Sequence, residues 1–551
     1  MAVDVGIVNL VFIWLIFGVY LVFLAIAGYW AKRKTKTLAD FMVAGRSIGP
    51  ILLGVSFGVT YFSSVLLVGG GRFSWNWGLA TLWIAGLNTL VGVTATYIFF
   101  GKRTRALGEH FDALTVPQIL ANRYQDKRIQ ILSATVQLVF QTIYVISIYM
   151  GLSVLLSVII PSDFVEIAFI ISTVITGIIT IIYLNFGGSH GAILTDAAEA
   201  IIILVGILMI FLFGIFAVGG INGLVSGLDS IDPSGGLTTF PGNAGLEVIG
   251  MVIVTSFGVW GLPQMITRFY TAKERKTLRW GLVVSTVWAF IVALFAYFNG
   301  SIARVYFDQN PTAGASAQNS ISFLMIKTLP PVFAGIVMAA ITAASLTTGE
   351  KIILMASSSY SIDVYQERTN ASDDQTLKVT RIVSTIVVVI GVIGAILILI
   401  YGLGRILDIC MFAWAAMGSV ILVPYVLGLF WKKGTGKAAL YSGIIALTVS
   451  ILHYFLFYTG GHYFWGGDDW ENFYPDFLLT IAQFDLFGRI LPFPISLETM
   501  HPFLTCIPVS LVLFVLFSKL DKDGVPPKEF LDKVFSAMRE QETLLGSDIK
   551  Q

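Results

Sequence analysis

The chain has 551 residues, of which 56% are hydrophobic and only 12% are charged. Because soluble globular proteins carry about 25% charged residues, this composition excludes an ordinary soluble domain and predicts an all-α polytopic membrane protein. The formal net charge of +1 argues against nucleic acid as a partner. The two cysteines, Cys410 and Cys506, both lie in apolar segments, which argues against a disulfide framework or a cysteine metal cluster.

A helix needs roughly 20 consecutive apolar residues to cross a lipid bilayer. About thirteen such spans are predicted, near 8–30, 49–71, 78–100, 130–159, 164–184, 192–218, 246–267, 280–300, 331–360, 379–401, 405–430, 437–458 and 501–518. No basic region precedes the first apolar run, and basic residues follow it, so we expect an uncleaved span rather than a signal peptide.

The distribution of basic residues predicts the orientation of the chain. Most of the 34 Lys and Arg residues fall in loops that are cytoplasmic if the N-terminus lies outside. Because cytoplasmic loops of membrane proteins are rich in Lys and Arg, we expect a multi-pass protein of the cell membrane with its N-terminus outside and its C-terminus in the cytoplasm. We expect the short C-terminal segment to be a solvated tail, too short for an enzymatic or sensor domain.

Two spans combine glycine or proline with polar residues near their middle. The span 49–71 contains Gly58 followed by VTYFSS, and the span 246–267 contains Gly261 and Pro263. Transporters use interrupted helices at matching positions of two repeats, although glycine in a membrane helix also simply permits close packing. The spacing favours an inverted repeat of two five-helix units whose first and sixth core helices are broken.

This repeat divides the chain into five parts. They are an extra N-terminal span with a basic cytoplasmic loop (1–48), the first five-helix repeat (49–218), an outer loop with the second repeat (219–430), two extra C-terminal spans with a long aromatic outer loop (431–518) and the cytoplasmic tail (519–551).

The span at 331–360 carries charged residues near its middle, in the stretch AASLTTGEKIILMASSSYSIDVY. At 100° per residue, Thr347, Thr348 and Lys351 share one face. Hydroxyl and backbone carbonyl oxygens suit a small hard cation such as Na⁺, with carbonyls supplied by the broken helix at Val59 and Phe62. From this helix alone, the alternative that the threonine hydroxyls bond back to their own helix is equally good.

Six stretches carry a resemblance to a known family. They read FMVAGRSIGPILLGVSFGVTYFSS, TVPQILANRY, NFGGSHGAILTDAAEAIIILVG, GLPQMITRFYTAKE, AASLTTGEKIILMASSSYSIDVY and VPYVLGLFWKKGTGKAA. In this order they resemble the sodium:solute symporter family over most of the chain. The resemblance implies a ten-helix inverted-repeat core with extra flanking helices, sodium-coupled symport rather than enzyme activity, and Na⁺ as coupling ion without a cofactor.

The resemblance also implies a sodium site between the first and eighth core helices. Carried over by position, its ligands are Val59, Phe62, Ala344, Thr347 and Thr348. The family pair usually begins with serine, so the threonine at 347 is a departure that keeps the hydroxyl.

Charged positions show both agreement with the family and departure from it. Asp196 matches the family aspartate on the fifth core helix, along the cytoplasmic exit route of the ion. Some members that carry amino acids have an aspartate where this chain has Tyr61, so any role of that carboxylate is absent here. An acidic residue at the position of Glu350 occurs in the family, whereas Lys351 is unexpected.

Three readings of Lys351 stay open. Asp196 and Glu199 share a helix face at i and i+3, and a buried cation is tolerable beside carboxylates. Lys351 pairs with Asp196, Glu199 or Glu350 as a gate, or its ammonium replaces the driving ion in a proton-coupled or sodium-independent transporter, or it snorkels into a wet vestibule. Because the hydroxyl pair is kept, we favour sodium and assign these four residues to the ion exit path or gate.

The solute pocket is expected at the midplane between the two breaks. Its candidate residues are Tyr61, Ser63, Ser64, Gln141, Thr255, Trp260, Gln264 and Trp414. Ordinary helix packing is an equal alternative for each aromatic. Apart from Arg72 near its outer end, the first broken helix has no charged group, which disfavours a strongly cationic solute. We expect an amino acid or monocarboxylate, with sugars and other polar solutes still open.

A sensor with a transporter fold is the main rival from another class, and the short tail argues against it. The five histidines are scattered without a catalytic or metal-binding pattern, which argues against an enzyme. Nothing in the sequence indicates an obligate protein partner.

Overall fold

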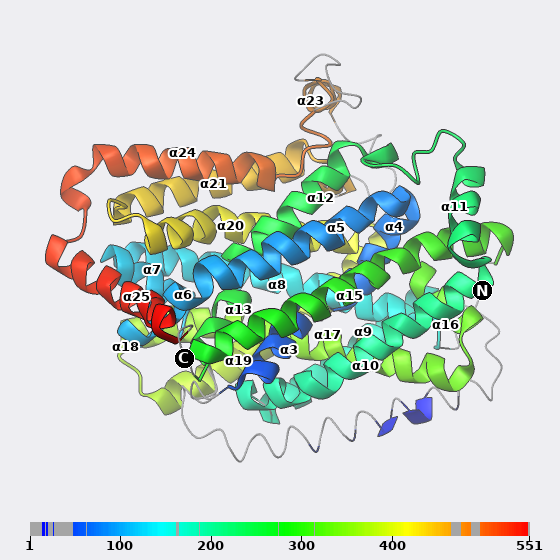
Figure 1. The fold of residues 1–551 in the computed structure, drawn as a ribbon, viewed down its shortest axis with the longest axis horizontal. Helices are drawn as coiled ribbons and strands as arrows, with labels where there is room; N and C mark the ends of the chain where they lie inside the picture. Colours follow the sequence, from blue (N-terminus) through cyan, green and yellow to red (C-terminus); the bar gives the residue numbers. More distant parts are fainter. Residues whose placement is uncertain are drawn as a thin grey trace.

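The computed structural model is helical throughout the part of the chain that it describes, apart from turns, loops and one isolated bridge between Ile48 and Ala272. It describes residues 48–61, 63–160, 165–186, 188–273, 275–312, 314–463, 475–485 and 496–548, together with a few positions between 11 and 26. The long helices run roughly alongside one another (Figure 1), as expected for a bundle that crosses a bilayer.

The described residues between 50 and 217 cover the segment expected to form the first five-helix unit. Its elements are α3 (Pro50–Tyr61), η2 (Val65–Gly70), α4 (Gly71–Trp77), η3 (Gly78–Thr81), α5 (Leu82–Leu87), η4 (Asn88–Gly101), α6 (Lys102–His110), α7 (Val116–Tyr124), α8 (Lys127–Ser157), α9 (Val165–Phe186) and α10 (Gly188–Ala217).

The second unit follows an outer loop. Its elements are α11 (Gly220–Ile231), η5 (Gly242–Ala244), α12 (Leu246–Phe257), η6 (Gly258–Gly261), α13 (Pro263–Ile266), α14 (Arg268–Thr271), α15 (Arg275–Gln309), α16 (Ser320–Thr328), α17 (Pro331–Tyr360), η7 (Ser361–Gln366), α18 (Glu367–Thr369), α19 (Asp373–Tyr401) and α20 (Ile406–Phe430). The chain continues through α21 (Gly436–Leu456), α22 (Thr459–His462), α23 (Asp476–Ala482), α24 (Phe503–Leu520), η10 (Lys522–Gly524) and α25 (Lys528–Asp548).

The predicted spans from residue 49 onward all fall on these helices. Within the described residues, nine helices are long and apolar enough to cross a membrane, or ten if the bent pair formed by Leu246–Gly261 and Pro263–Thr271 counts as one span. The predicted first span, 8–30, lies largely outside the described residues, so the count of thirteen stays a prediction. The all-helical membrane fold itself is confirmed.

Both predicted breaks interrupt a helix. In the first unit, α3 ends at Tyr61 and the chain resumes as a π-helical turn at Val65. In the second unit, α12 passes through the 3-10 turn η6 and an extended Leu262 before α13 begins at Pro263, and the two halves differ in direction by 57°. Proline suits this first helical position because it lacks the N–H group that would have no partner there.

Helix α8 forms the centre of the bundle, contacting α17, α20, α19 and α9. It is 31 residues long and is buried along most of its length, and α17 and α20 are buried on nearly all sides. Helices that are apolar all round belong in a protein interior. The broken helices pack around this centre, where α3 contacts α15, α10 and α17, and η6 contacts α20.

The C-terminal segment was predicted to be a solvated tail, and that prediction is wrong. It forms α25, which packs against α6 (Figure 1) and buries Leu531, Val534, Phe535 and Met538. These positions recur every three to four residues, which gives the helix one apolar face that needs a partner. We call the end of the bundle at which α6, α7, α18 and α25 gather the α25 end.

Candidate functional site

The hydroxyl pair of α17 lies in the interior of the bundle, where Thr347 and Thr348 are fully buried. The Thr348 Oγ1 donates a hydrogen bond to the backbone oxygen of Val59, at a distance of 3.0 Å. This bond reaches across to the last turn of α3 rather than back along α17. The structure therefore brings together two of the predicted sodium ligands, while Phe62 lies outside the described residues.

Thr347 contacts a different group. Its Oγ1 donates to Oε2 of Glu199 at 2.6 Å and lies 3.3 Å from the backbone oxygen of Ala344. Adjacent hydroxyls of one helix thus reach two neighbouring helices, α3 and α10. These contacts are hydrogen bonds. A hard cation would replace them by entering between the same oxygens, which such ions hold at about 2.3–2.6 Å, the range found for Ca²⁺.

Lys351 lies one turn further along α17, toward the α25 end. Its Nζ forms an ion pair with Oδ1 of Asp196 on α10, and the Ser56 hydroxyl of α3 donates to the other carboxylate oxygen. The lysine is 4% exposed and the aspartate is completely buried. A charge in the apolar interior is costly unless it is paired and hydrogen-bonded, and this carboxylate meets both conditions.

Arg268 is a member of this cluster that sequence reasoning missed. It is 6% exposed, it donates from Nη2 to Oγ1 of Thr60 at 3.2 Å, and it interacts electrostatically with Asp196 and Glu350. In the sequence Arg268 directly follows the span 246–267, where a basic residue is expected in a cytoplasmic loop. Its spacing of four from Gln264 was the available signal, because that spacing places both on one helical face.

The four residues assigned to the ion exit path or gate converge. Glu350 is 2% exposed and faces Arg268, and Lys351 interacts with Glu199 as well as with Asp196. Three carboxylates and two cations therefore occupy one buried cluster, which we call the charge cluster: Asp196, Glu199, Arg268, Glu350 and Lys351.

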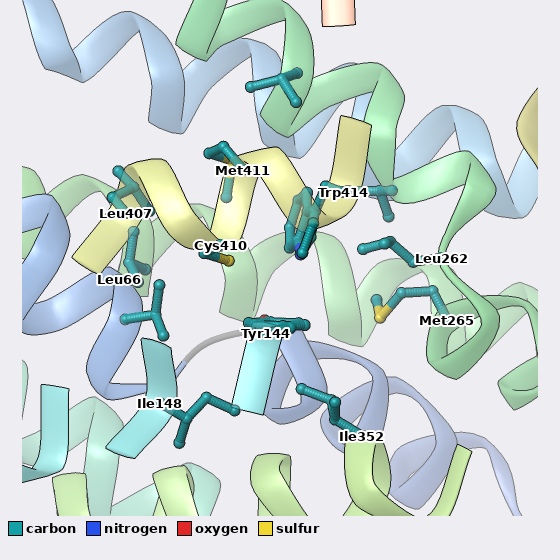
Figure 2. Close-up of a cluster of buried hydrophobic side chains, with 14 of the residues drawn as sticks. Leu66, Tyr144, Ile148, Leu262, Met265, Ile352, Leu407, Cys410, Met411 and Trp414 are labelled. Atoms are coloured by element: carbon teal, nitrogen blue, oxygen red, sulfur yellow. The ribbon is translucent and has the colours of Figure 1, made fainter. Parts of the chain in front are cut away.

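A cavity of about 30 Å³ lies beside the first break, where Val65 and Leu66 line it. The residues that line it are Val65, Leu66, Ile84, Ala85, Asn88, Tyr144, Thr255, Ala293, Tyr297, Leu407, Cys410, Met411 and Trp414. None of these described lining residues carries a formal charge. Several are drawn in Figure 2, where Cys410 and Trp414 of α20 lie on the side of that helix that faces Tyr144 of α8.

Two predicted solute residues, Thr255 and Trp414, line this cavity. The Trp414 ring meets Tyr144 edge to face, with 5.9 Å between centroids, a favourable arrangement for aromatic pairs. Tyr144 and Asn88 were not predicted. Tyr144 follows the predicted Gln141 by three positions on the same helix, which was a usable signal, whereas Asn88 had none.

The other predicted solute residues contact protein groups outside the cavity lining. Gln141 donates from Nε2 to Oε1 of Gln264 at 2.6 Å, and the Trp260 indole donates to the backbone oxygen of Val91 at 3.0 Å.

The two serines of the first break contact their surroundings through hydrogen bonds. The Ser64 hydroxyl donates to the backbone oxygen of Ile148 at 3.1 Å, and the Ser63 hydroxyl accepts from the amide of Val65 at 3.3 Å. The side chain of Tyr61 lies outside what the structure describes.

Comparisons with known proteins agree with this architecture. A model of the sodium:solute symporter family matches residues 41–446. Among solved structures, a Na⁺-coupled sialic acid symporter in a substrate-bound, outward-open state matches with a TM-score of 0.73 and 18% identity, covering 94% of this chain and 98% of that one. At that identity the likeness supports the fold, including its inverted repeat, and nothing further.

Curated relatives match over most of their length. The osmoregulated proline transporter OpuE of Bacillus subtilis is 27% identical over 440 residues, which cover 79% of this chain and 87% of the relative. A sodium/pantothenate symporter of Haemophilus influenzae is 28% identical over 440 residues, covering 79% and 88%. Because the family match spans well over half of the sequence and includes both broken helices, the charge cluster and the cavity, the chain belongs to the sodium:solute symporter family.

Proposed function

We propose that this protein carries a small amino acid or monocarboxylate across the cell membrane together with Na⁺, by alternating access of the cavity to the two sides. Family membership makes the chain a multi-pass membrane transporter rather than an enzyme, with Na⁺ as its coupling ion. The observation that carries the proposal is the bond of Thr348 to Val59, because it joins α17 to the broken helix beside the cavity.

Sodium would bind where these oxygens meet. Val59, Ala344, Thr347 and Thr348 supply two carbonyls and two hydroxyls, and the proposal adds Phe62 as a further carbonyl. Hydroxyl oxygens accept as well as donate, so both threonines can turn their lone pairs toward an ion. An ion held between α3 and α17 would draw the two helices together and so shape the neighbouring cavity.

The ion pair of Lys351 and Asp196 would act as a gate at the α25 end, which we take to face the cytoplasm. The pair connects α17 to α10, and Ser56 adds α3 through its bond to the same aspartate. Arg268 adds α14 through Thr60. These four elements cannot separate without breaking the ion pair or one of the two hydrogen bonds, so the gate couples their motions.

The burial of Lys351 favours the gate over the other two readings. An ammonium that is 4% exposed does not snorkel to water in this conformation. The hydroxyl pair next to it keeps its oxygens on Val59 and Glu199, which supports sodium rather than the lysine as the driving cation. The alternative is a proton-coupled or sodium-independent transporter, and a comparison of protein stability in sodium, potassium and choline salts tests it.

The solute would occupy this cavity in a widened form, because about 30 Å³ is room for little more than a water molecule. An apolar portion of the solute would then lie against Leu66, Met411 and Trp414. The lining residues are mostly apolar and uncharged, which suits a solute whose charged groups are few. The relatives named for proline and pantothenate support an amino acid or a carboxylate. A sugar or another polar solute is the alternative, since the wall also offers the hydrogen-bonding side chains of Asn88, Tyr144, Thr255, Tyr297 and Trp414.

Thermal stability in detergent tests the sodium site directly. We would compare NaCl with KCl and choline chloride at equal ionic strength, for the parent and for Thr348→Ala. A ligand that binds only the folded state stabilises it by about 2.7 kcal/mol at 100 times its Kd. We expect sodium alone to raise the melting temperature of the parent, and Thr348→Ala to lose that response.

Thr342→Ala is the matched control. Thr342 lies on the same helix, is equally buried, and its hydroxyl has no hydrogen-bond partner among the described atoms. It should keep the sodium response. A parent that ignores sodium but carries solute in response to a pH gradient would refute sodium coupling and support the alternative that uses Lys351.

A further inference from the structure

The charge cluster contains two carboxylates of α10 that make different contacts. Asp196 has one oxygen on the Lys351 ammonium and the other on the Ser56 hydroxyl. Glu199, three residues later, is also completely buried, but its Oε2 accepts the hydroxyl of Thr347 at 2.6 Å. The Asp196 carboxylate therefore pairs with Lys351, and the Glu199 carboxylate accepts a hydrogen bond from Thr347 of the hydroxyl pair.

Glu199 lies where an ion between α3 and α17 would meet α10. Thr347 Oγ1 is 2.6 Å from the glutamate oxygen and 3.3 Å from the Ala344 carbonyl, and the hydroxyl of the next residue, Thr348, is 3.0 Å from the Val59 carbonyl. A bound cation would enter among these oxygens in place of the hydrogen bonds. The hydroxyl of Thr347 is thus common to the proposed sodium site and to the carboxylate.

The charge balance of the cluster points the same way. Its three carboxylates and two cations leave a formal charge of −1. An uncompensated charge in a protein interior costs several kcal/mol, and one bound monovalent cation would neutralise it. A site made only of carbonyl and hydroxyl oxygens would leave that charge beside the ion without direct contact.

We propose that Glu199 is a direct ligand of the coupling sodium ion, adding a carboxylate to the carbonyl and hydroxyl oxygens of the site. The assignment rests on the proposed sodium site and goes beyond it, because it moves Glu199 from the exit path to the ion itself. It also separates the roles of the two α10 carboxylates, with Asp196 serving the gate and Glu199 serving the ion.

Sodium titrations of thermal stability test the assignment in the purified full-length protein. The variants are Glu199→Gln, which keeps the size of the side chain, and Glu350→Gln, which removes the same charge from the same cluster. Thr348→Ala is the variant that abolishes the site. We expect Glu199→Gln to raise the Kd for sodium at least about tenfold, equivalent to about 1.4 kcal/mol, and Glu350→Gln to raise it much less.

The controls separate this assignment from the sodium site as a whole. If Glu199→Gln and Glu350→Gln weaken sodium binding equally, the glutamate acts only through its charge and the assignment is wrong. If Glu199→Gln binds sodium as the parent does while Thr348→Ala does not, the site is real and Glu199 is not a ligand. A parent without any sodium response overturns both the site and the assignment.

A double-mutant cycle provides a second route if Glu199→Gln is too unstable to purify alone. Glu199→Asp keeps the charge but shortens the side chain, and Thr347→Val removes the shared hydroxyl. Groups that bind one ion give non-additive losses, so the double variant should bind sodium little worse than the poorer single variant. Fully additive losses would contradict direct ligation by Glu199.

Discussion

Replacing Lys351 by methionine should open the gate at the α25 end. Removing one partner of a buried ion pair costs about 3–5 kcal/mol, because the other charge stays buried. Asp196 keeps its bond from Ser56 and lies near Arg268, so we take the lower value, about 3 kcal/mol. The closed state bears this cost, whereas in an open state water reaches the aspartate. The ratio of open to closed molecules should therefore rise by roughly a hundredfold.

Cysteine labelling would measure this opening. Ser358 lies two turns beyond Lys351 toward the α25 end and is completely buried, and its hydroxyl donates to the backbone oxygen of Met355 on its own helix. A Ser358→Cys protein in which Cys410 and Cys506 are replaced by alanine offers one thiol in the closed pathway. In detergent without solute, Lys351→Met should speed its reaction with a polar maleimide by one to two orders of magnitude.

The double variant Lys351→Met with Asp196→Asn is the control. It removes both charges and so restores the parent's formal charge of −1 in the cluster. No charge beyond that of the parent then favours opening, and labelling should slow again toward the rate of the parent. If Lys351→Met labels within about twofold of the parent, the reasoning fails, because the ion pair then contributes nothing to closure. If the double variant labels as fast as the single one, loss of packing rather than loss of pairing explains the result.

Three further predictions concern the cavity, the second break and the arginine. Trp414→Ala should raise the half-saturating concentration of solute about tenfold or more in uptake assays with labelled proline and pantothenate, and should leave the sodium response of solute-free protein intact. Gly261→Ala should destabilise the protein by about 1–3 kcal/mol, because its new Cβ would lie 2.8 Å from the Leu422 side chain. Gly86→Ala is the control: a Cβ at Gly86 would meet open space, so this variant should not lower the melting temperature. Arg268→Gln makes the charge cluster more negative, so it should lower the melting temperature of the protein in sodium-free buffer. For the same reason it should lower the Kd for sodium. An unchanged Kd would show that the arginine is screened from the site.

Much of the fold follows from patterns that a single segment carries. A span of apolar residues has the length of a bilayer, so the helices from residue 49 onward were predictable. Glycine and proline act locally on the backbone, which is why the breaks near Ser63 and at Pro263 could be located. The C-terminal helix was missed because its apolar face is short and interrupted by charges, and only its partner α6 shows that it is buried.

The site was predictable to the extent that it depends on helical periodicity. A spacing of three places Thr348 and Lys351 on one face of their helix, and the same spacing places Asp196 and Glu199 on one face of theirs. The cost of burying a charge then requires a partner for each charged side chain. Sequence alone left the partner of Lys351 open among three carboxylates, because the relative height of two helices is a property of packing. The position of Tyr144 in the cavity wall likewise depends on how α8 packs against its neighbours.

The contact between α6 and the second broken helix gives α25 a mechanical role. Arg105 of α6 donates to the backbone oxygens of Ala272 and Lys273, just past α14, at 3.2 and 3.3 Å, and α25 rests on α6. A displacement of α25 would therefore be passed through α6 to the half-helix that carries Arg268. We expect a bulky group attached to α25 to slow the transport cycle.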